Sequence, residues 1–198
     1  MNEPHEYPID PKEVKVMEQV ADSVSTYTIA YQFFDRFRTT EISMFLDGKN
    51  ILAFKQDGKL LTTRWNLDEL ALWLRAFLDN MKEDPYPVDC EGEFAAQKDD
   101  TARHFDSDDD DEFDAYYDRI DEWSVRHRWH IASSGAILAD VFFQLVGDNV
   151  EVSWDNRSVE EGVTFQYESG GVRVPKKKEF IEVTDAFLKA YAEHWYSV

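Results

Sequence analysis

The stretch from Trp123 to Arg157 constrains the fold more than any other part of the 198-residue sequence. Apolar residues recur there every three or four positions, in a segment that is also rich in Arg and His, and this pattern predicts a long helix from about Asp111 to Ser134. Two apolar runs follow, Ala139–Val146 and Val150–Trp154, joined by Gly147-Asp148-Asn149. Such runs around a tight turn predict two antiparallel strands.

Two Asp-Gly pairs, Asp47-Gly48 and Asp57-Gly58, divide the first part of the chain. An Asp-Gly pair between apolar runs favours a hairpin, because a type I′ turn needs positive φ at both central residues. With the alternating run Val24–Phe34, these pairs predict an antiparallel sheet. The run Asn66-Leu67-Asp68-Glu69 then resembles a capping box and predicts a helix that stops before Asp84-Pro85.

The C-terminal part indicates one more hairpin and one more helix. Gly170-Gly171 lies between two short strand-like runs, and the segment 176–195 places apolar residues on one helical face. The sequence therefore predicts an α+β fold, in which antiparallel sheets built from hairpins are covered by about three helices. The length fits one globular domain, 1–198.

Two segments, 13–82 and 111–198, each contain the order strand, turn, strand, turn, strand, helix, which in the second segment follows the long helix. A duplicated β-β-β-α unit is one interpretation of this order, and coincidence of patterning is the other. We expect the segment between the halves, residues 83–110, to be an acidic loop, since it contains prolines, a glycine and many carboxylates.

A net charge of −20 limits the partners that this chain can bind. Residues 83–122 hold seventeen Asp or Glu against three Lys or Arg. This charge argues against nucleic acid or an anionic membrane as a direct partner, because binding to phosphates needs Lys and Arg. It favours fast, salt-sensitive association with a basic protein surface. The oligomeric state is left open.

Other features exclude several functional classes. No apolar run approaches the ~20 residues of a membrane span, and the acidic, proline-rich start MNEPHEYPIDPKE is not typical of a signal or transit peptide. The single Cys90 excludes an internal disulfide framework. Together these features predict a cytoplasmic protein. The glycine pairs are typical of turns rather than of phosphate-binding loops, so no cofactor is expected.

His127, His130, Asp140 and Glu151 are candidate ligands of a metal-dependent hydrolase or nuclease. The two histidines are one helical turn apart, as in metal-binding pairs. The set lacks a third ligand at diagnostic spacing, so we expect no metal there and interpret His127 as a core residue. Arg126, Arg128 and Arg157 either pair internally with the acidic segment, which is the favoured interpretation, or hold an anionic group.

Acidic and aromatic residues alternate at the start of the long helix, and this composition is typical of a surface that meets a basic partner. Carboxylates speed the encounter of the two proteins, and aromatic side chains anchor the complex. The alternative is a solvated loop. The predicted partner-binding residues are Asp106, Asp108, Asp109, Asp110, Asp111, Asp114, Tyr116 and Tyr117. We also expect Trp123 to be buried against the second hairpin, with Trp154 on one face of that hairpin.

The run RHRWHIASSGAILADVFFQLVGDNVEVSWDNR resembles a stretch of uncharacterised bacterial proteins. This resemblance covers about a sixth of the chain, implies a bacterial origin and carries no catalytic residues. In overall character the chain is similar to acidic immunity proteins and to phage-encoded decoys that mimic nucleic acid. The expected function is therefore non-catalytic binding of a basic protein, such as a bacterial immunity or defence-associated regulator. The hydrolase and a DNA-mimic inhibitor are the alternatives.

Overall fold

The computed structural model describes residues 18–20, 26–35, 38–129, 137, 139–156, 161–174 and 176–196. These residues form twelve strands and four helices. The strands are β1 (Glu18–Val20), β2 (Tyr27–Phe34), β3 (Thr39–Leu46), β4 (Lys49–Asn50), β5 (Phe54–Gln56), β6 (Lys59–Leu61), β7 (Thr63–Trp65), β8 (Arg128–Trp129), β9 (Asp140–Val146), β10 (Asn149–Asp155), β11 (Val163–Phe165) and β12 (Gly170–Val174). The helices are α1 (Asp68–Asp79), α2 (Ala95–Ala102), α3 (Asp110–His127) and α4 (Lys177–Tyr196).

The strands form three antiparallel sheets. The first has the order β1-β2-β3-β4, with β7 also paired to β3. The second has the order β12-β10-β9-β8, and the third, β11-β5-β6, joins strands from both ends of the chain. The prediction of an α+β fold with antiparallel sheets is confirmed, although the described residues contain four helices rather than three. The proposed duplication stays a prediction.

Both Asp-Gly pairs form the expected turns. Asp47 and Gly48 have φ of 47° and 75° and connect β3 to β4, while Asp57 and Gly58 have φ of 50° and 74° and connect β5 to β6. Positive φ at both central positions is the requirement of a type I′ turn. Gly147, with φ of 58°, begins the tight connection from β9 to β10. The local turn chemistry therefore determined these hairpins.

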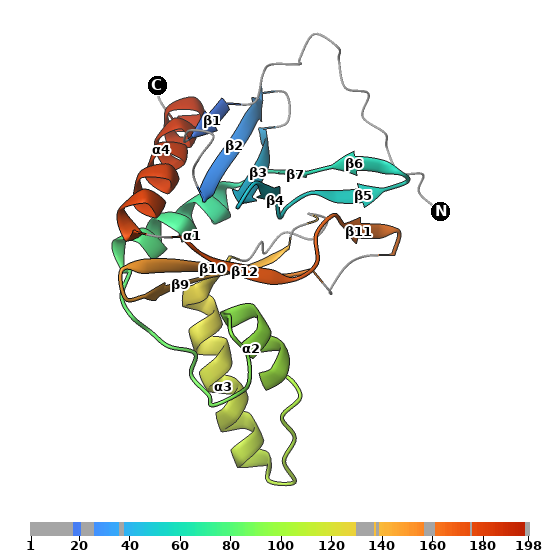
Figure 1. Ribbon diagram of the computed structural model, residues 1–198, viewed down its shortest axis with the longest axis vertical. Coiled ribbons are helices and arrows are strands. Elements are labelled where there is room, and N and C mark those ends of the chain that lie inside the picture. The colour runs from blue at the N-terminus through green and yellow to red at the C-terminus, as the bar shows by residue number, and fades with distance from the viewer. Residues whose placement is uncertain are drawn as a thin grey trace.

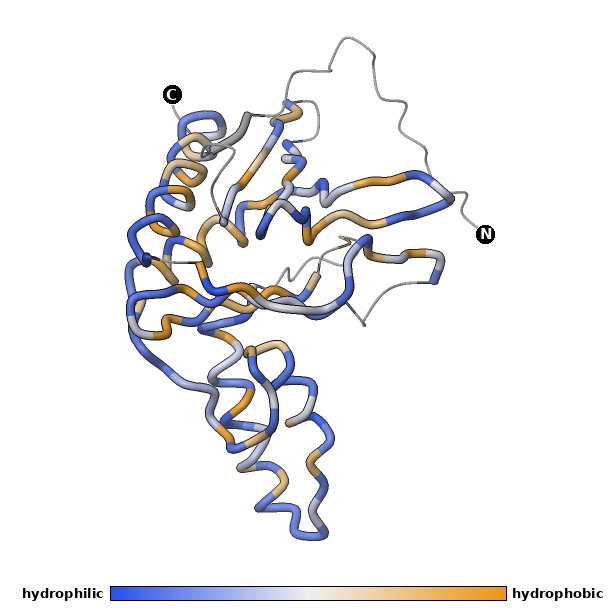
Figure 2. Tube along the Cα trace, in the orientation of Figure 1, coloured by the Kyte–Doolittle hydropathy of each residue, from blue (hydrophilic) through white to orange (hydrophobic). Residues whose placement is uncertain are grey.

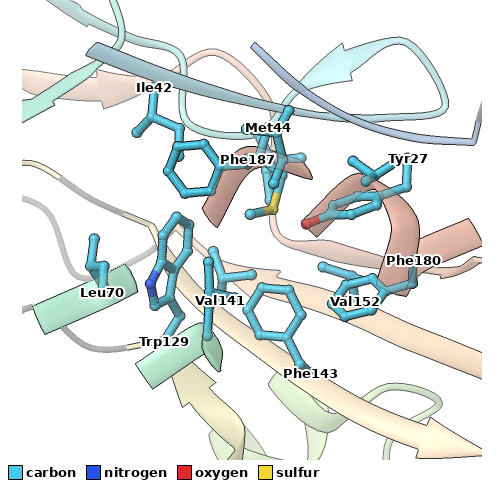
Figure 3. Close-up of a cluster of buried hydrophobic side chains, with 14 of the residues drawn as sticks. Tyr27, Ile42, Met44, Leu70, Trp129, Val141, Phe143, Val152, Phe180 and Phe187 are labelled. Carbon is cyan, nitrogen blue, oxygen red and sulfur yellow. The ribbon is translucent and has the colours of Figure 1, made fainter. Parts of the chain in front are cut away.

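The main hydrophobic core lies between the first and second sheets and is closed by α1 and α4. Figure 3 shows how the side chains meet. The first sheet contributes Tyr27, Ile42 and Met44, the second contributes Val141, Phe143 and Val152, and α4 contributes Phe180 and Phe187. Aromatic rings fill much of this space, which explains the high aromatic content of the sequence.

A second, smaller cluster lies on the opposite face of the second sheet. It contains Tyr86, Ala95, Ala96, Ala102, Ile120, Trp123 and Phe142. We call α2, α3 and the residues between them (95–127) the acidic lobe. Figure 1 shows the acidic lobe projecting from this sheet, away from the main core, and Figure 2 shows that its far end is mainly hydrophilic. The second sheet is thus buried on both faces.

The long helix ends earlier than expected. The sequence predicted a helix from Asp111 to Ser134, but α3 ends at His127, and β8 follows directly. Trp129 is fully buried in the main core, and β8 pairs with β9. Pairing with β9 and burial of this indole override the helical periodicity, which is only a local preference. His130, Ser134 and Gly135 lie outside the described residues.

The acidic segment 83–110 is not simply a loop, so that prediction was wrong. It contains α2, whose Ala95, Ala96 and Ala102 are buried in the second cluster. The segment was assigned as a loop because its charge and prolines hide a short helix that depends on tertiary contacts. Short helices obtain most of their stability from packing rather than from propensity.

The predicted hairpin at Gly170-Gly171 was also wrong. Both glycines lie inside β12, which pairs with β10 rather than with β11. A Cβ at Gly171 would stand 2.4 Å from Cγ of Phe94, and one at Gly170 would stand 3.2 Å from Cζ2 of Trp154. The glycines therefore permit close approach of two aromatic rings to the strand, which is the other common reason for glycine within a strand.

Candidate interaction surface

The predicted acidic residues lie at the free end of the acidic lobe. Residues 106–122 contain ten Asp or Glu against the single Arg119, and all ten carboxylate residues are exposed. They lie in the turn before α3 and along the helix as far as Glu122, on the element that projects from the body (Figure 1). A dense set of like charges on a projecting element produces a strong local negative potential.

Part of the acidic run has a structural role. Asp109 is the N-cap of α3, and its side chain accepts hydrogen bonds from the backbone N–H groups of Asp111 and Glu112 at 3.0 and 3.1 Å. Ser107 donates a hydrogen bond to the carboxylate of Glu112 at 2.7 Å. Negative charge at a helix N-terminus is favoured by the helix dipole. These contacts explain the position of some carboxylates, but not their number.

Tyr116 and Tyr117 make contacts within the acidic lobe. The ring of Tyr116 stacks on Phe105 at 3.9 Å between centroids, and the hydroxyl of Tyr117 donates to the carbonyls of Arg103 and Phe105, both at 3.1 Å. These contacts hold the turn after α2 against α3. Phe113, which is 37% exposed, is a more accessible aromatic side chain and was not among the predicted site residues.

Helix α2 is fixed to the second sheet by two side chains of β10. The carboxylate of Glu151 accepts a hydrogen bond from the backbone N–H of Ala95 at 2.7 Å, and Ser153 Oγ accepts one from Ala96 at 3.1 Å. They satisfy N–H groups that a helix N-terminus leaves without intrahelical partners. Burial raises the pKa of Glu151, while the Ala95 hydrogen bond and the charge of Arg173 oppose that shift. This cap could not be predicted from local sequence patterns, because Glu151 and Ala95 are far apart in the chain.

The base of α3 is held by Asp84. Its carboxylate contacts Nε of Arg126 at 2.9 Å and Nε2 of His127 at 3.0 Å, and its backbone carbonyl accepts from the indole of Trp123 at 3.0 Å. Nδ1 of His127 lies 2.8 Å from the carbonyl oxygen of Phe143. Both ring nitrogens of His127 therefore face oxygen acceptors, and both contacts are hydrogen bonds only when the ring carries two hydrogens and a positive charge.

Three predictions about this region are confirmed. Trp123 is fully buried in the second cluster beside Phe142, and Trp154 is buried in the main core. His127 is a buried residue with polar partners. Arg126 pairs with Asp84 of the acidic segment, as expected, whereas Arg128 pairs with Asp140, outside that segment, at 3.2 and 2.6 Å. Arg157 lies outside the described residues.

The described candidate hydrolase residues do not converge. His127 faces Asp84, Asp140 is paired with Arg128, and Glu151 caps α2. Asp140 and Glu151 stand opposite Asp155 and Gln144, so they are four positions apart along the ladder, about 13 Å. In the part of the chain that the structure describes, no group of three or more His, Cys, Asp or Glu is arranged to hold a metal ion. The absence of bound metal stays a prediction, which elemental analysis of the purified protein would test.

A shallow cavity of about 550 Å³ lies elsewhere, between the β3–β4 turn and residues 166–172. Trp154, Lys49 and Glu168 contribute to its wall. The residues that line it do not include any of the predicted site residues.

Comparisons with protein-family models, with curated proteins and with solved structures find no match to this chain. None of the helices within the described ranges has both the length and the hydropathy of a membrane-spanning segment. The geometry of the acidic lobe is therefore the main indication of function.

Proposed function

We propose that this protein is a non-catalytic binding protein that engages a basic protein surface through the acidic lobe. One observation supports the proposal above all others: ten exposed carboxylate residues gather on an element that projects from the body, against a single arginine. Charge concentrated in this way steers a basic partner during diffusion and accelerates its association. A regulator that covers the functional surface of a basic protein, as an immunity protein does, fits this arrangement.

The arrangement of the lobe also suits a docking element. The second hydrophobic cluster and the Asp84 contacts hold α3 in a fixed direction relative to the body, and the Glu151 cap fixes α2 to the same sheet. A rigid element loses little conformational entropy when it binds, so more of the interaction energy contributes to affinity. A mobile acidic tail would carry the same charge without this advantage.

The proposal is tested by using the 198-residue chain as bait in a bacterial lysate, with washes from about 0.05 to 0.5 M sodium chloride. The lobe variant replaces Asp108, Asp110, Asp111 and Asp114 by Asn and keeps the N-cap Asp109. The control variant neutralises four exposed acids outside the lobe, Asp57→Asn, Asp148→Asn, Glu161→Gln and Glu168→Gln. Captured proteins are quantified by mass spectrometry.

We expect the wild type and the control variant to retain the same basic protein, and the lobe variant to lose it at lower salt. With that partner purified, the lobe variant should associate more slowly, with a smaller change in dissociation rate, because exposed charges act mainly before contact. Equal retention by the lobe and control variants at every salt concentration would refute a role for the acidic lobe.

One specific observation favours a second candidate, a decoy for a nucleic-acid-binding protein. Residues 110–122 of α3 carry seven acids and one arginine, a net −6 over about 20 Å of helix. That is one charge per about 3.3 Å, close to the roughly 3.4 Å per phosphate along one strand of B-DNA. If the captured partner binds nucleic acid, duplex DNA should displace it from the wild-type protein in competition. Simultaneous binding of DNA and this protein to the partner would exclude the decoy.

A further inference from the structure

His127 is the last residue of α3, where the acidic lobe joins the second sheet, and it is only 4% exposed. Its Nε2 lies 3.0 Å from a carboxylate oxygen of Asp84, and its Nδ1 lies 2.8 Å from the carbonyl oxygen of Phe143. An ionised carboxylate and a backbone carbonyl can only accept hydrogen bonds. Both nitrogens of a buried imidazole therefore face acceptors.

Only the charged ring satisfies both of these contacts. A neutral imidazole carries one hydrogen, so one of its nitrogens presents a lone pair. That lone pair would face an oxygen lone pair at hydrogen-bond distance, on the Asp84 carboxylate or on the Phe143 carbonyl. The charged ring donates from both nitrogens, and a hydrogen bond between charged partners is stronger than one between neutral groups.

The elements packed around the ring present both favourable and unfavourable groups to a positive charge. The indole of Trp123 stacks on the imidazole with 4.4 Å between centroids, and the face of an indole attracts a cation. From α1, the ring of Phe77 lies edge-on at 6.3 Å. Arg126 is a like charge that disfavours the imidazolium, but it donates to the same Asp84 oxygen at 2.9 Å. The carboxylate of Asp84 thus compensates part of both positive charges.

We propose that His127 is a pH-sensitive latch at the base of the acidic lobe, which holds α3 to β9 and to Asp84 while the imidazole is charged and releases that end of the helix when rising pH removes the proton. A neutral ring needs a hydrogen-bond donor at its second nitrogen, and an unsatisfied polar group is costly in a buried site. Water can supply that donor only if the end of the helix moves. This inference concerns how the lobe is attached and does not rest on the proposed function.

Asp84 connects the latch to the rest of the base of the lobe. Its backbone carbonyl accepts hydrogen bonds from the indole of Trp123 at 3.0 Å and from the side-chain amide of Gln144 at 3.2 Å. A displacement of Asp84 from a neutral imidazole would therefore disturb contacts to both α3 and β9. Ile120 and Trp123 also pack in the second hydrophobic cluster, so we expect the end of the helix to open without loss of the fold.

The direction of the pH dependence follows from the two partners. Burial would raise the pKa of Asp84, but hydrogen bonds from His127 and Arg126 outweigh burial and lower it, so this carboxylate is ionised at neutral pH. The latch needs that ionised carboxylate together with the charged imidazole. It therefore holds in mildly acidic solution and opens as the pH rises through the range in which the ring loses its proton.

His194 on α4 provides a matched comparison. Its Nε2 lies 2.8 Å from a carboxylate oxygen of Asp35, but its side chain is 31% exposed. A neutral ring at this position can donate to Asp35 from Nε2, and solvent is available to the rest of the ring. Loss of the His194 proton should therefore leave the helix in place.

The inference is tested on the 198-residue chain by nuclear magnetic resonance from about pH 5 to 9, which brackets the range in which histidine side chains ordinarily titrate. The nitrogen chemical shifts of each imidazole report whether the ring carries one hydrogen or two. Amide hydrogen exchange, corrected for the intrinsic effect of pH, reports the opening of α3, with α4 as the internal reference. The variants are His127→Gln, Asp84→Asn and the control His194→Gln.

In the wild type, we expect the His127 ring to carry two hydrogens at the acidic end of this range. As it loses one, the protection of amides in the last turns of α3 should fall at least about tenfold, as the loss of one hydrogen bond to a charged group implies. Protection in α4 should not change. His194→Gln should behave as the wild type.

The two latch variants should abolish the pH dependence of α3 for different reasons. His127→Gln removes the group that titrates. Asp84→Asn supplies an amide that can accept a hydrogen bond from the charged ring and donate one to the neutral ring, so both states of His127 are satisfied.

Protection of α3 that stays constant with pH in the wild type would overturn the inference, whether the ring loses its proton or keeps it. An unchanged pH dependence in Asp84→Asn or in His127→Gln would also overturn it. If one of these variants does not fold, the wild type and the other variant still decide. No partner is present in these measurements, so every outcome leaves the proposed function standing.

Discussion

Asp84 and Glu151 lie on the same side of the second sheet, and the fold shifts the pKa values of their carboxylates in opposite directions. Burial would raise the pKa of Asp84, but hydrogen bonds from His127 and Arg126 and the charges of those residues outweigh it, so the pKa is lowered. For Glu151 burial dominates and raises the pKa. The structural reason is the number of partners: Asp84 has two side-chain donors, whereas Glu151 has a backbone N–H at 2.7 Å and an arginine 4.0 Å away.

The first prediction concerns Asp84. Its pKa is lower in the folded than in the unfolded chain. Its contribution to the free energy of unfolding is therefore present above the unfolded pKa near 3.9 and is lost as the pH falls through the folded pKa. Asp84→Asn should lower the free energy of unfolding at pH 7 by about 1–2 kcal/mol. The difference from the wild type should shrink below about pH 4. Urea unfolding between pH 7 and 3 measures this, with the exposed Asp57→Asn as control; a pH-independent difference would contradict it.

The second prediction concerns Glu151. Its pKa is raised in the folded chain, which therefore binds the proton more tightly than the unfolded chain does. The resulting contribution to the free energy of unfolding is present below the unfolded pKa near 4.3 and is lost as the pH rises through the folded pKa. Glu151→Gln keeps an acceptor for Ala95 without the buried charge, and should match or exceed the wild type in stability at pH 7. Glu151→Ala leaves that N–H without a partner and should cost about 1–3 kcal/mol. Equal losses for Gln and Ala in urea unfolding would show that the cap requires a charge.

The elements differ in how far the sequence could predict them. The β3–β4 and β5–β6 hairpins depend on Asp-Gly turns, which act within four residues, and α1 depends on an apolar stripe with Leu70, Leu74 and Phe77 buried. These were predicted because their causes are local. Helix α2, the end of α3 and the position of β12 depend on residues more than ten positions away, and periodicity holds no information on such contacts.

The third prediction tests the contact between α2 and β12. Gly171→Ala places a methyl group 2.4 Å from Cγ of Phe94, so it should lower the free energy of unfolding by about 1–3 kcal/mol. Gly170→Ala, whose new methyl would meet Trp154 at 3.2 Å, should cost less. Combining Gly171→Ala with Phe94→Ala removes the clash, so a double-mutant cycle measured in urea should show favourable coupling. Additive losses would contradict close packing of Phe94 on this strand.

The fourth prediction concerns the attachment of α3. Trp123 is fully buried, and its indole donates to the carbonyl of Asp84. Trp123→Ala should therefore lower the free energy of unfolding by about 3–5 kcal/mol. Phe113→Ala, at an exposed position on the same helix, serves as the control and should cost much less. An unchanged melting temperature for Trp123→Ala would show that α3 does not pack on the sheet as described.

At the scale of the whole molecule, the charge of −20 is unevenly distributed, and the sequence showed this directly. What the sequence did not show is the direction in which the charge projects. The alternation of acids and aromatics suggested that Tyr116 and Tyr117 face a partner. In the structure both residues contact Phe105 inside the lobe, Tyr116 through its ring and Tyr117 through a hydrogen bond to the Phe105 carbonyl. The exposure of Val125 and Leu72 was not predicted either, because the exposure of an apolar residue depends on what packs beside it in the fold.

The fifth prediction concerns self-repulsion. Carboxylates crowded on α3 repel one another over about 30 Å at 0.01 M salt but only about 3 Å at 1 M. The melting temperature of the wild type should therefore rise with sodium chloride over this range, and that of the lobe variant should start higher and rise less. The control variant should follow the wild type more closely, since its four acids are dispersed. Calorimetry at graded salt measures this, and parallel curves for all three proteins would contradict it.

Strand β9 separates the two hydrophobic clusters, with Phe142 in one and Val141 and Phe143 in the other. The lobe is therefore built into the body at its base and is not a detachable appendage, whereas the turn at residues 106–109 makes few contacts beyond its own helix. Insertions and sequence drift are tolerated where the backbone is exposed and poorly tolerated where it is packed. We therefore expect changes in the length of α3 to be tolerated at its free end, and changes in the angle at which it leaves the sheet to be tolerated poorly.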